Sequence, residues 1–466
     1  MSIFDWLKSA PYSQTIENED EIKKSYKYWR LRIFYGMYIG YIFYYFTRKS
    51  LTFAMPVLMN DLGYSKIDLG ILASILSITY GMSKFLSGLL SDRANPRFFM
   101  AIGLMMTGII NILFGFSSSI AFFALFWGLN GLFQGFGWPP CARLLTHWYS
   151  QKERGTWWGF WNTSHNIGGA FIPLVAASCA QCWGWRYAMY LPGALCVAAG
   201  LFLINRLRDT PQSLGLPPIE KFKNDYLPEA EKNHELSTKQ ILFQYLLKNK
   251  YIWLLAIAYF FVYIIRTAIN DWSVLFLVEK KGYSLITAGS CIFCFEIGGM
   301  FGSLAAGFFS DKLFKGRRGP INILFSFAAI FAVVGFWISP AMLPALDLLF
   351  LFVIGFLIFG PQMLIGIAAA ELSSKKAAGS ATGFVGLFAY LGAAAAGLPL
   401  GMMTEKWGWQ GFFIAIVACA AISALLLLPL WSVKYKPSIV KDSLEREKDK
   451  TLNVQTLCDS SDVQEG

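Results

Sequence analysis

The stretch Tyr-Tyr-Phe-Thr-Arg-Lys-Ser at residues 44–50 places two cations, Arg48 and Lys49, inside an apolar run from Ile33 to Leu58. Such a run is long enough to span a bilayer, which takes about 20 helical residues. A cation at that depth costs roughly 2.5–3.5 kcal/mol to insert, so it is retained where it pairs with another group or faces an aqueous cavity. The two residues therefore mark a candidate functional site in a membrane protein.

The same arrangement returns in the second half of the chain. Arg266 lies in an apolar run that begins at Trp253, about 220 residues after Arg48, and several short motifs recur at a similar spacing. The recurring motifs are Gly63-Tyr64-Ser65 with Gly282-Tyr283-Ser284, Gly88-x3-Asp92 with Gly307-x3-Asp311, and Trp183-Gly184-Trp185 with Trp407-Gly408-Trp409. This period predicts a duplicated half with one buried arginine in each copy.

The composition excludes a soluble protein. Of 466 residues, 55% are hydrophobic and 15% are charged, and the chain contains 41 Phe and 16 Trp, which is typical of a polytopic membrane protein. The net charge of +11 is assigned to cytoplasmic loops, so we expect no nucleic-acid partner. The acidic residues before Arg30 and the lack of an apolar core with a cleavage site predict no removable signal peptide.

Two C-x2-C pairs, Cys179/Cys182 and Cys291/Cys294, invite a metal or redox interpretation. Both pairs lie in apolar, helix-like segments without a second ligand pair, so we interpret them as packing thiols. We expect no metal site and no cofactor.

The apolar runs predict an all-α integral membrane protein with twelve transmembrane helices in two six-helix halves. The predicted helices cover residues 31–58, 67–91, 97–116, 119–146, 154–181, 186–206, 250–278, 285–310, 319–339, 343–372, 377–404 and 409–434. The predicted domains are an N-terminus (1–30), an N-terminal half (31–206), a polar linker (207–249), a C-terminal half (250–434) and a disordered tail (435–466).

The basic residues predict the topology. Most of the 40 Lys and Arg fall in the termini, the central linker and alternate loops. The other loops hold only Lys66, Arg186, Lys280, Lys281 and Lys406. By the positive-inside rule, both termini and the central linker are cytoplasmic.

Three predicted helices carry a polar and aromatic stripe around a cationic or protonatable group. Residues three, four and seven positions apart share a helix face. The stripes are Tyr41, Tyr44 and Tyr45 with Arg48; Ser77 and Tyr80 with Lys84; and Trp158, Trp161 and Asn162 with His165.

The acids at membrane depth do not balance the cations. Glu296 is clearly inside, and Asp271, five residues after Arg266, is a second candidate. The excess of positive charge favours a site for a multiply charged anion, and two guanidinium groups match phosphate geometry. A plainer interpretation pairs Lys49 with Glu296, lets Lys84 extend to the cytoplasmic surface, and makes His165 a core residue.

The repeated Gly-x3-Asp loops place Asp92-Arg93 and Asp311-Lys312 at the predicted cytoplasmic ends of the second and eighth helices. One hypothesis is a gate latch in which the aspartates bridge to neighbouring basic residues and hold one conformation. The alternative is ordinary topogenic charge.

Twelve helices in two halves with these paired loops resemble the major facilitator superfamily. Within it, the chain resembles the organophosphate:phosphate antiporter family over nearly all of residues 28–434, and most closely its hexose-phosphate branch. The motifs that carry the resemblance are Arg48-Lys49, Tyr80-x3-Lys84-x3-Gly88-x2-Ser-Asp92-Arg93, Gln134-Gly-Phe-Gly-Trp138-Pro139-Pro140, Trp161-Asn162-x2-His165-Asn166 and Arg266-x4-Asp271-Trp272.

The resemblance implies that Arg48 and Arg266 bind a phosphoryl group and that His165 adds a proton-sensitive hydrogen bond. It implies that Lys49, Lys84 and the acids Glu296 and Asp271 adjust the electric field of the site. The residues expected to line the cavity are Tyr41, Tyr45, Tyr80, Trp138, Asn162, Tyr263 and Tyr390.

We therefore expect a monomeric antiporter in the bacterial inner membrane that exchanges a sugar phosphate, most simply glucose 6-phosphate, for inorganic phosphate. Two alternatives remain open: a sensor of hexose phosphate that signals through a partner kinase, and a glycerol 3-phosphate antiporter. An enzyme is not expected, because His-Glu-x2-His is absent and no pair of acids shares a helix face at membrane depth.

Overall fold

The structure, a computed structural model, describes residues 7–433 except 92–93, 225–246, 342 and 374–377. The described residues are almost entirely helical, with one isolated β-bridge between Lys8 and Ala94. The predicted disordered tail lies outside the described residues, as do Asp92 and Arg93.

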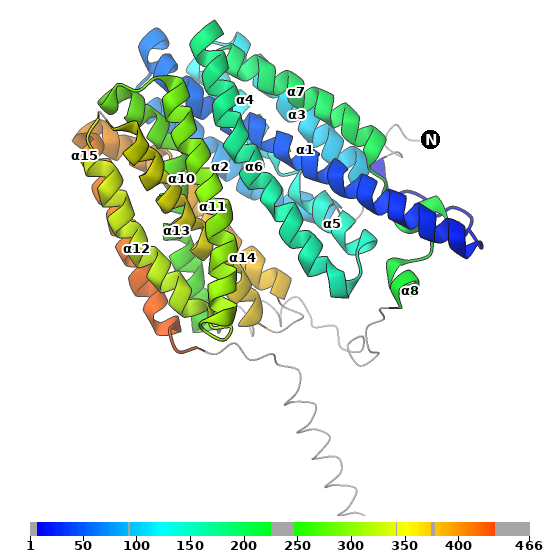
Figure 1. The fold of residues 1–466 in the computed structure, drawn as a ribbon. Helices are drawn as coiled ribbons and strands as arrows, with labels where there is room; N and C mark the ends of the chain where they lie inside the picture. Colours follow the sequence, from blue (N-terminus) through cyan, green and yellow to red (C-terminus); the bar gives the residue numbers. More distant parts are fainter. Residues whose placement is uncertain (1–6, 92–93, 225–246, 342, 374–377, 434–466) are drawn as a thin grey trace, which may run out of the picture.

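The N-terminal helices form one group in Figure 1 and the C-terminal helices form a second group beside it. The first group is α1 (Glu19–Leu62), α2 (Lys66–Ser91), α3 (Pro96–Phe116), α4 (Ile120–Gln134), α5 (Trp138–Trp148), α6 (Gln151–Trp183) and α7 (Tyr187–Arg206). The second is α10 (Lys250–Lys281), α11 (Leu285–Lys312), α12 (Arg318–Ile338), α13 (Pro344–Glu371), α14 (Ala378–Ala395) and α15 (Leu398–Leu427).

Helices occupy all twelve predicted segments, but not with the predicted boundaries. α1 begins at Glu19 rather than at residue 31, because Asn18 caps it by accepting hydrogen bonds from the backbone N–H groups of Asp20 and Glu21. Hydropathy marks only the part of a helix inside the membrane. The predicted helix 119–146 is divided into α4 and α5, since Pro139 and Pro140 restart a helix after a break at residues 135–137.

Among the described residues, eight stretches are long and apolar enough to cross a membrane by composition and length alone. α1, α2 and α6, which carry the polar stripes, are not among them. One stretch, Ala381–Leu430, contains 50 residues, which at about 1.5 Å per residue exceeds twice the thickness of a bilayer core. It is interrupted at Gly408, so it supplies two crossings.

The repeated glycines adopt the same backbone conformation in both halves. Gly63 ends α1 at φ 69° and Gly282 ends α10 at φ 68°. Gly184 and Gly408, each between two tryptophans, also have positive φ, at 92° and 65°. Left-handed φ values favour glycine, so the duplicated sequence motifs correspond to duplicated turns. The internal repeat is confirmed at these positions.

The two groups of helices meet along three seams, α6 against α11, α2 against α14 and α15, and α1 against α10. Glycines permit close approach at the seams. A Cβ atom on Gly70 of α2 would lie 2.8 Å from the carbonyl oxygen of Gly397, and one on Gly289 of α11 would lie 3.0 Å from that of Pro173. The cavity described below lies between the two groups.

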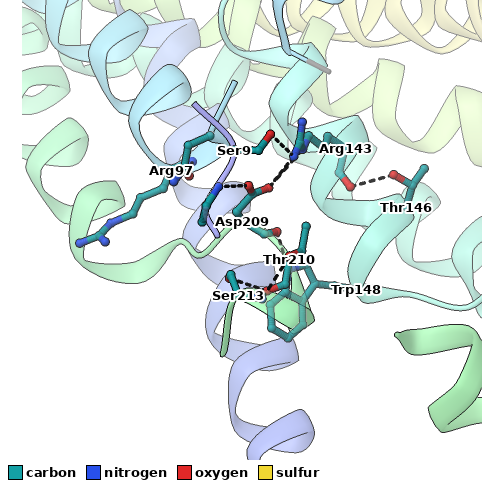
Figure 2. A network of polar contacts seen from close by, with 10 residues as sticks. Ser9, Arg97, Arg143, Thr146, Trp148, Asp209, Thr210 and Ser213 are labelled. Atoms are coloured by element: carbon teal, nitrogen blue, oxygen red, sulfur yellow. Dashed lines mark hydrogen bonds and ion pairs between the residues drawn. The ribbon is translucent and has the colours of Figure 1, made fainter. Parts of the chain in front are cut away.

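The first part of the central linker is docked on the N-terminal helices, although a polar connection was predicted. It contains the 3-10 turn η2 (Pro211–Leu214) and the short helix α8 (Ile219–Lys223). Figure 2 shows Asp209, which is 2% exposed, accepting a hydrogen bond from Arg143 of α5. The other carboxylate oxygen of Asp209 accepts from the backbone N–H of Ala10 over 2.9 Å. A buried carboxylate requires such partners, and they fix this segment in place.

Candidate anion-binding cavity

A cavity of about 160 Å³ lies between the two groups of helices. Every residue predicted from the sequence to bind substrate lines it, and so does Asp271. These residues are Tyr41, Tyr45, Arg48, Lys49, Tyr80, Lys84, Trp138, Asn162, His165, Tyr263, Arg266 and Tyr390.

Arg48 lies on α1 and is held by neutral groups. Its Nε and Nη2 atoms donate to Oε1 of Gln134 over 3.1 Å and 3.0 Å. Its guanidinium carbon lies 4.6 Å from the centre of the Tyr45 ring and 4.3 Å from that of Tyr80. No carboxylate within the described ranges forms an ion pair with it. Arg48 therefore brings an uncompensated positive charge to the cavity.

Gln134 is a site residue that was not among those predicted. It is 1% exposed and its Nε2 donates to the carbonyl of Tyr44 and to Oγ1 of Thr47, both over 3.0 Å. These bonds fix the amide so that its oxygen points at Arg48. The sequence signal for Gln134 was its place at the start of the motif Gln134 to Pro140. Nothing in the residue spacing, however, indicates that its side chain contacts Arg48 of α1.

Arg266 lies on α10, in the other half, and contacts aromatic rings. Its guanidinium carbon lies 4.7 Å from the ring centre of Phe359 and 5.6 Å from that of Tyr263. Its Nε is buried without a hydrogen-bond acceptor, and no ion pair joins it to a carboxylate in the part of the chain the structure describes. A buried donor without a partner is costly, so this atom is suited to an anionic ligand.

His165 on α6 has one ring nitrogen occupied and one available. Nδ1 contacts the carbonyl oxygen of Asn162, which can only accept, so Nδ1 carries a proton. Nε2 is buried without a hydrogen-bond partner among the described residues. In the neutral ring Nε2 accepts a hydrogen bond, and in the protonated ring it donates one, so the protonation of the ring decides its role toward a bound anion.

Two of the plainer interpretations of the lysines are wrong. Lys84 does not extend to the surface; its Nζ donates to the hydroxyl of Tyr390 over 3.3 Å and lies 5.1 Å from the ring centre of Trp138. Lys49 pairs with Asp271 of α10 rather than with Glu296. The reason is that α1 packs against α10 and brings these two side chains together across the seam.

Glu296 does not line the cavity and is satisfied by amides. It is 0% exposed, and its carboxylate accepts from Nδ2 of Asn270 over 2.7 Å and from Nδ2 of Asn166 over 3.3 Å. Asn270 itself lines the cavity, as do Gln362 and Thr267, none of which was predicted.

The cavity therefore has an excess of positive charge. Lys49 and Asp271 compensate each other, whereas Arg48, Arg266 and Lys84 form no ion pair among the described residues. Polyatomic anions with several acceptor oxygens suit such donors. No group of His, Cys, Asp and Glu that could hold a metal ion occurs in the described part of the chain.

Of the predicted latch residues, the structure describes the C-terminal pair, Asp311 and Lys312, but not the N-terminal pair. Asp311 pairs with Arg318 over 2.5 Å, and Arg318 also pairs with Glu371 over 2.9 Å. The prediction that Asp311 bridges to a neighbouring basic residue is confirmed, but all three residues belong to the C-terminal half. Lys312 is the last residue of α11, and the Asp92–Arg93 copy lies outside the described residues.

The two halves are joined at the end that was predicted to be non-cytoplasmic. The backbone N–H of Lys66, the first residue of α2, donates to Glu405 of α15 over 3.2 Å. The repeat has a counterpart: the N–H of Ile286 in α11 donates to Gln181 of α6 over 3.4 Å. Each half thus supplies an acceptor to the start of a helix in the other, and Lys66 adds an ion pair with Glu279 over 2.9 Å.

Comparisons with known proteins identify the family. Residues 37–397 match the Major Facilitator Superfamily. A probable hexose phosphate transport protein of Chlamydia pneumoniae is 60% identical, covering 92% of this chain and 97% of that protein. The membrane sensor protein UhpC of Escherichia coli is 50% identical (91% and 97%), and the glycerol-3-phosphate transporter of Bacillus subtilis is 42% identical (91% and 97%).

Among solved structures, an inward-facing, unoccupied bacterial homolog of the human lysosomal transporter Spinster matches with a TM-score of 0.73 at 15% identity. The match covers 88% of this chain and 99% of that one, and at this identity it supports the fold alone. The chain is a multi-pass membrane protein that belongs to the major facilitator superfamily, in its organophosphate:phosphate antiporter branch.

Proposed function

We propose that this protein exchanges a sugar phosphate, most simply glucose 6-phosphate, for inorganic phosphate by alternating access. The observation that carries the proposal is that Arg48 and Arg266, one from each half, line the same cavity and neither pairs with a carboxylate. The 60% identical relative, named as a probable hexose phosphate transport protein, supports the choice of substrate.

The phosphoryl group would bridge the two guanidinium groups. Arg48 is already oriented by Gln134, and the free Nε of Arg266 and Nε2 of His165 would complete the contacts to the phosphoryl oxygens. Lys84 would add a further positive charge, and Tyr45 and Tyr80 would donate hydroxyl hydrogen bonds or stack on the arginines. The sugar would lie among the remaining aromatic residues of the cavity.

The positive charge also explains why exchange would be obligatory. Reorientation requires the two halves to rock about the cavity and bring α1 and α10 closer at one end and apart at the other. Without an anion, the two buried arginines repel each other in a medium of low dielectric constant and oppose this motion. A bound phosphate or sugar phosphate removes the repulsion, so only the loaded carrier reorients quickly. The driving force is then the phosphate gradient.

We place the protein in the bacterial inner membrane, with both termini and the central linker in the cytoplasm and with the domain boundaries predicted above. The distribution of lysine and arginine supports this orientation. It acts as a monomeric carrier and not as an enzyme, in keeping with its transporter relatives.

A sensor of hexose phosphate with a partner kinase is the second candidate, because UhpC of Escherichia coli is named a membrane sensor protein. The docked segment at residues 210–224 would give a partner kinase a defined surface to bind on the predicted cytoplasmic face. A glycerol 3-phosphate antiporter is a third, since such transporters are also relatives. All three would use the same arginines.

The test is counterflow into liposomes that contain the purified protein and internal phosphate. Uptake of labelled glucose 6-phosphate should need internal phosphate and vanish in Arg48→Ala and in Arg266→Ala, whereas Lys27→Ala, which removes an exposed charge outside the cavity, should behave as wild type. Binding of glucose 6-phosphate without uptake would favour the sensor. Uptake of glycerol 3-phosphate in preference to glucose 6-phosphate would favour the third candidate.

A further inference from the structure

Four arginines lie at or near the end of α7, and none of them lines the cavity. Arg97 of α3 donates through Nε to the carbonyl of Ile204 over 2.5 Å. Arg32 of α1 and Arg208 both donate to the carbonyl of Asn205, over 3.1 Å and 3.0 Å. Two guanidinium groups that share one acceptor are close neighbours. Arg206 is the fourth, and we call the four residues the arginine cluster.

Capping of α7 explains part of this arrangement but not its charge. The free carbonyls at the end of a helix carry about half a negative charge, and one cation balances that. No carboxylate in the ranges the structure describes forms an ion pair with any of the four arginines. Burial and the neighbouring charges of Arg97 and Arg32 lower the pKa of Arg208. The cluster therefore holds more positive charge than the helix end can balance.

The repeat provides an internal comparison. In the C-terminal half, α12 begins with Arg318, as α3 begins near Arg97, but Arg318 is neutralised by Asp311 and Glu371. In the N-terminal half, the buried Asp209 is bound by Arg143, and Figure 2 shows Arg97 pointing away from that network. Among the described residues, which do not include Asp92, protein carboxylates thus compensate this position in the C-terminal half only.

The surroundings of the cluster are those of a membrane interface. The guanidinium carbons of Arg32 and Arg208 lie 5.1 Å and 5.0 Å from the ring centre of Trp29, and that of Arg206 lies 5.8 Å from the ring of Tyr35. Tryptophan and tyrosine prefer the headgroup level of a bilayer. Leu31, which precedes Arg32, and Leu201, five residues before Arg206, are 61% and 59% exposed and offer an apolar surface for acyl chains.

We propose that the arginine cluster, Arg32, Arg97, Arg206 and Arg208, binds the phosphate headgroup of an anionic phospholipid. With the predicted orientation, this lipid belongs to the cytoplasmic leaflet. A phosphodiester oxygen pair would accept from the outward-facing guanidinium nitrogens, and the acyl chains would follow the exposed leucines into the bilayer. The arginine cluster shares no residue with the central cavity, so the lipid proposal does not depend on the proposed transport activity.

Native mass spectrometry of the purified full-length protein in detergent would test this proposal. The protein is mixed with equal amounts of phosphatidylglycerol and phosphatidylcholine that have the same acyl chains. Wild type should retain phosphatidylglycerol preferentially. Because each arginine near a bilayer surface changes the affinity for anionic lipid by about fivefold, the double variant R32Q/R208Q should bind phosphatidylglycerol about 25-fold more weakly, with phosphatidylcholine unchanged. Glutamine can still donate to the α7 carbonyls.

Two variants and one competitor serve as controls. Lys27→Gln removes an exposed cation from the same helix and should stay within twofold of wild type. R32K/R208K keeps the charges and should keep the preference. Excess inorganic phosphate should leave the lipid bound. Four results would each overturn the proposal. Wild type could retain both lipids equally, or R32Q/R208Q could keep the preference for phosphatidylglycerol. Lys27→Gln could lose as much affinity for phosphatidylglycerol as R32Q/R208Q does, or inorganic phosphate could displace the lipid. If R32Q/R208Q does not fold, the wild-type and R32K/R208K measurements decide.

Discussion

Replacing Gln134 by leucine should disable the phosphate site without touching an arginine. Gln134 accepts two hydrogen bonds from Arg48 and is itself fixed by the carbonyl of Tyr44 and the hydroxyl of Thr47. Leucine has a similar size but neither donates nor accepts. In Gln134→Leu, Arg48 therefore loses the acceptor of two hydrogen bonds, and its guanidinium is free to turn over the rings of Tyr45 and Tyr80.

The magnitude follows from the burial of this pair. A hydrogen bond to a charged group contributes about 1.5–3 kcal/mol, and Gln134 is 1% exposed, so water cannot take its place easily. We count one such bond, because the cation–π contacts of Arg48 compensate for the second. A loss of about 1.5–3 kcal/mol corresponds to a decrease of roughly 10- to 150-fold in kcat/KM for phosphate exchange.

The assay is phosphate exchange in liposomes, with Asn322→Leu as the matched control. Asn322 is a fully buried amide on α12, and neither of its side-chain polar atoms has a hydrogen-bond partner in the described part of the chain, so its replacement by leucine should leave exchange unchanged. Gln134→Glu keeps the acceptor but neutralises Arg48, and should lower exchange further than leucine does. The reasoning is refuted if Gln134→Leu retains more than half of wild-type exchange, or if Asn322→Leu loses as much.

Three further outcomes are expected. Lys49→Met and Asp271→Asn should each reduce exchange, and the double variant should recover part of it with a coupling energy above about 1 kcal/mol; additive losses would contradict their pairing. Glu405→Ala removes the acceptor for the first N–H of α2 and should speed hydrogen exchange there by about two- to fivefold. Burial raises the pKa of Glu153, but the hydrogen bond and charge of Arg30 outweigh it, and the pKa is lowered. The pair should therefore stabilise the fold above the ordinary glutamate pKa of about 4.3 and lose this effect as pH falls through the lower folded value. The difference in Tm between wild type and Glu153→Gln should shrink as the pH falls from about 7 to about 4, and a constant difference would exclude this linkage.

The residues on one helix were predictable because helix geometry decides which side chains share a face. Tyr41 and Tyr45 accompany Arg48, Tyr80 accompanies Lys84, and all of them line the cavity. The spacing of three, four or seven residues places side chains on one helix face whatever the helix packs against, but Tyr44 and Trp158, which share that spacing, do not line the cavity. Tyr390 was placed by family resemblance rather than by spacing, and it also lies in the cavity.

The partners of these residues were less predictable. The sequence suggested Glu296 for Lys49, but the packing of α1 against α10 presents Asp271 instead. Glu296 is held by Asn270 and Asn166, which come from different halves. Which carboxylate meets which cation depends on the rotation of each helix about its axis, and no periodicity within one helix contains that information.

By itself, the sequence determined that this chain spans a membrane in two similar halves and that each half carries an arginine at membrane depth. Apolar length and a repeat period are properties of the chain, and the glycine turns at Gly63 and Gly282 follow from local backbone preference. The tertiary structure decided that Gln134 orients Arg48, and that Gln181 and Glu405 accept hydrogen bonds from helices of the opposite half. These contacts join residues far apart in the chain, and they exist only because the packed helices bring the side chains within hydrogen-bonding distance.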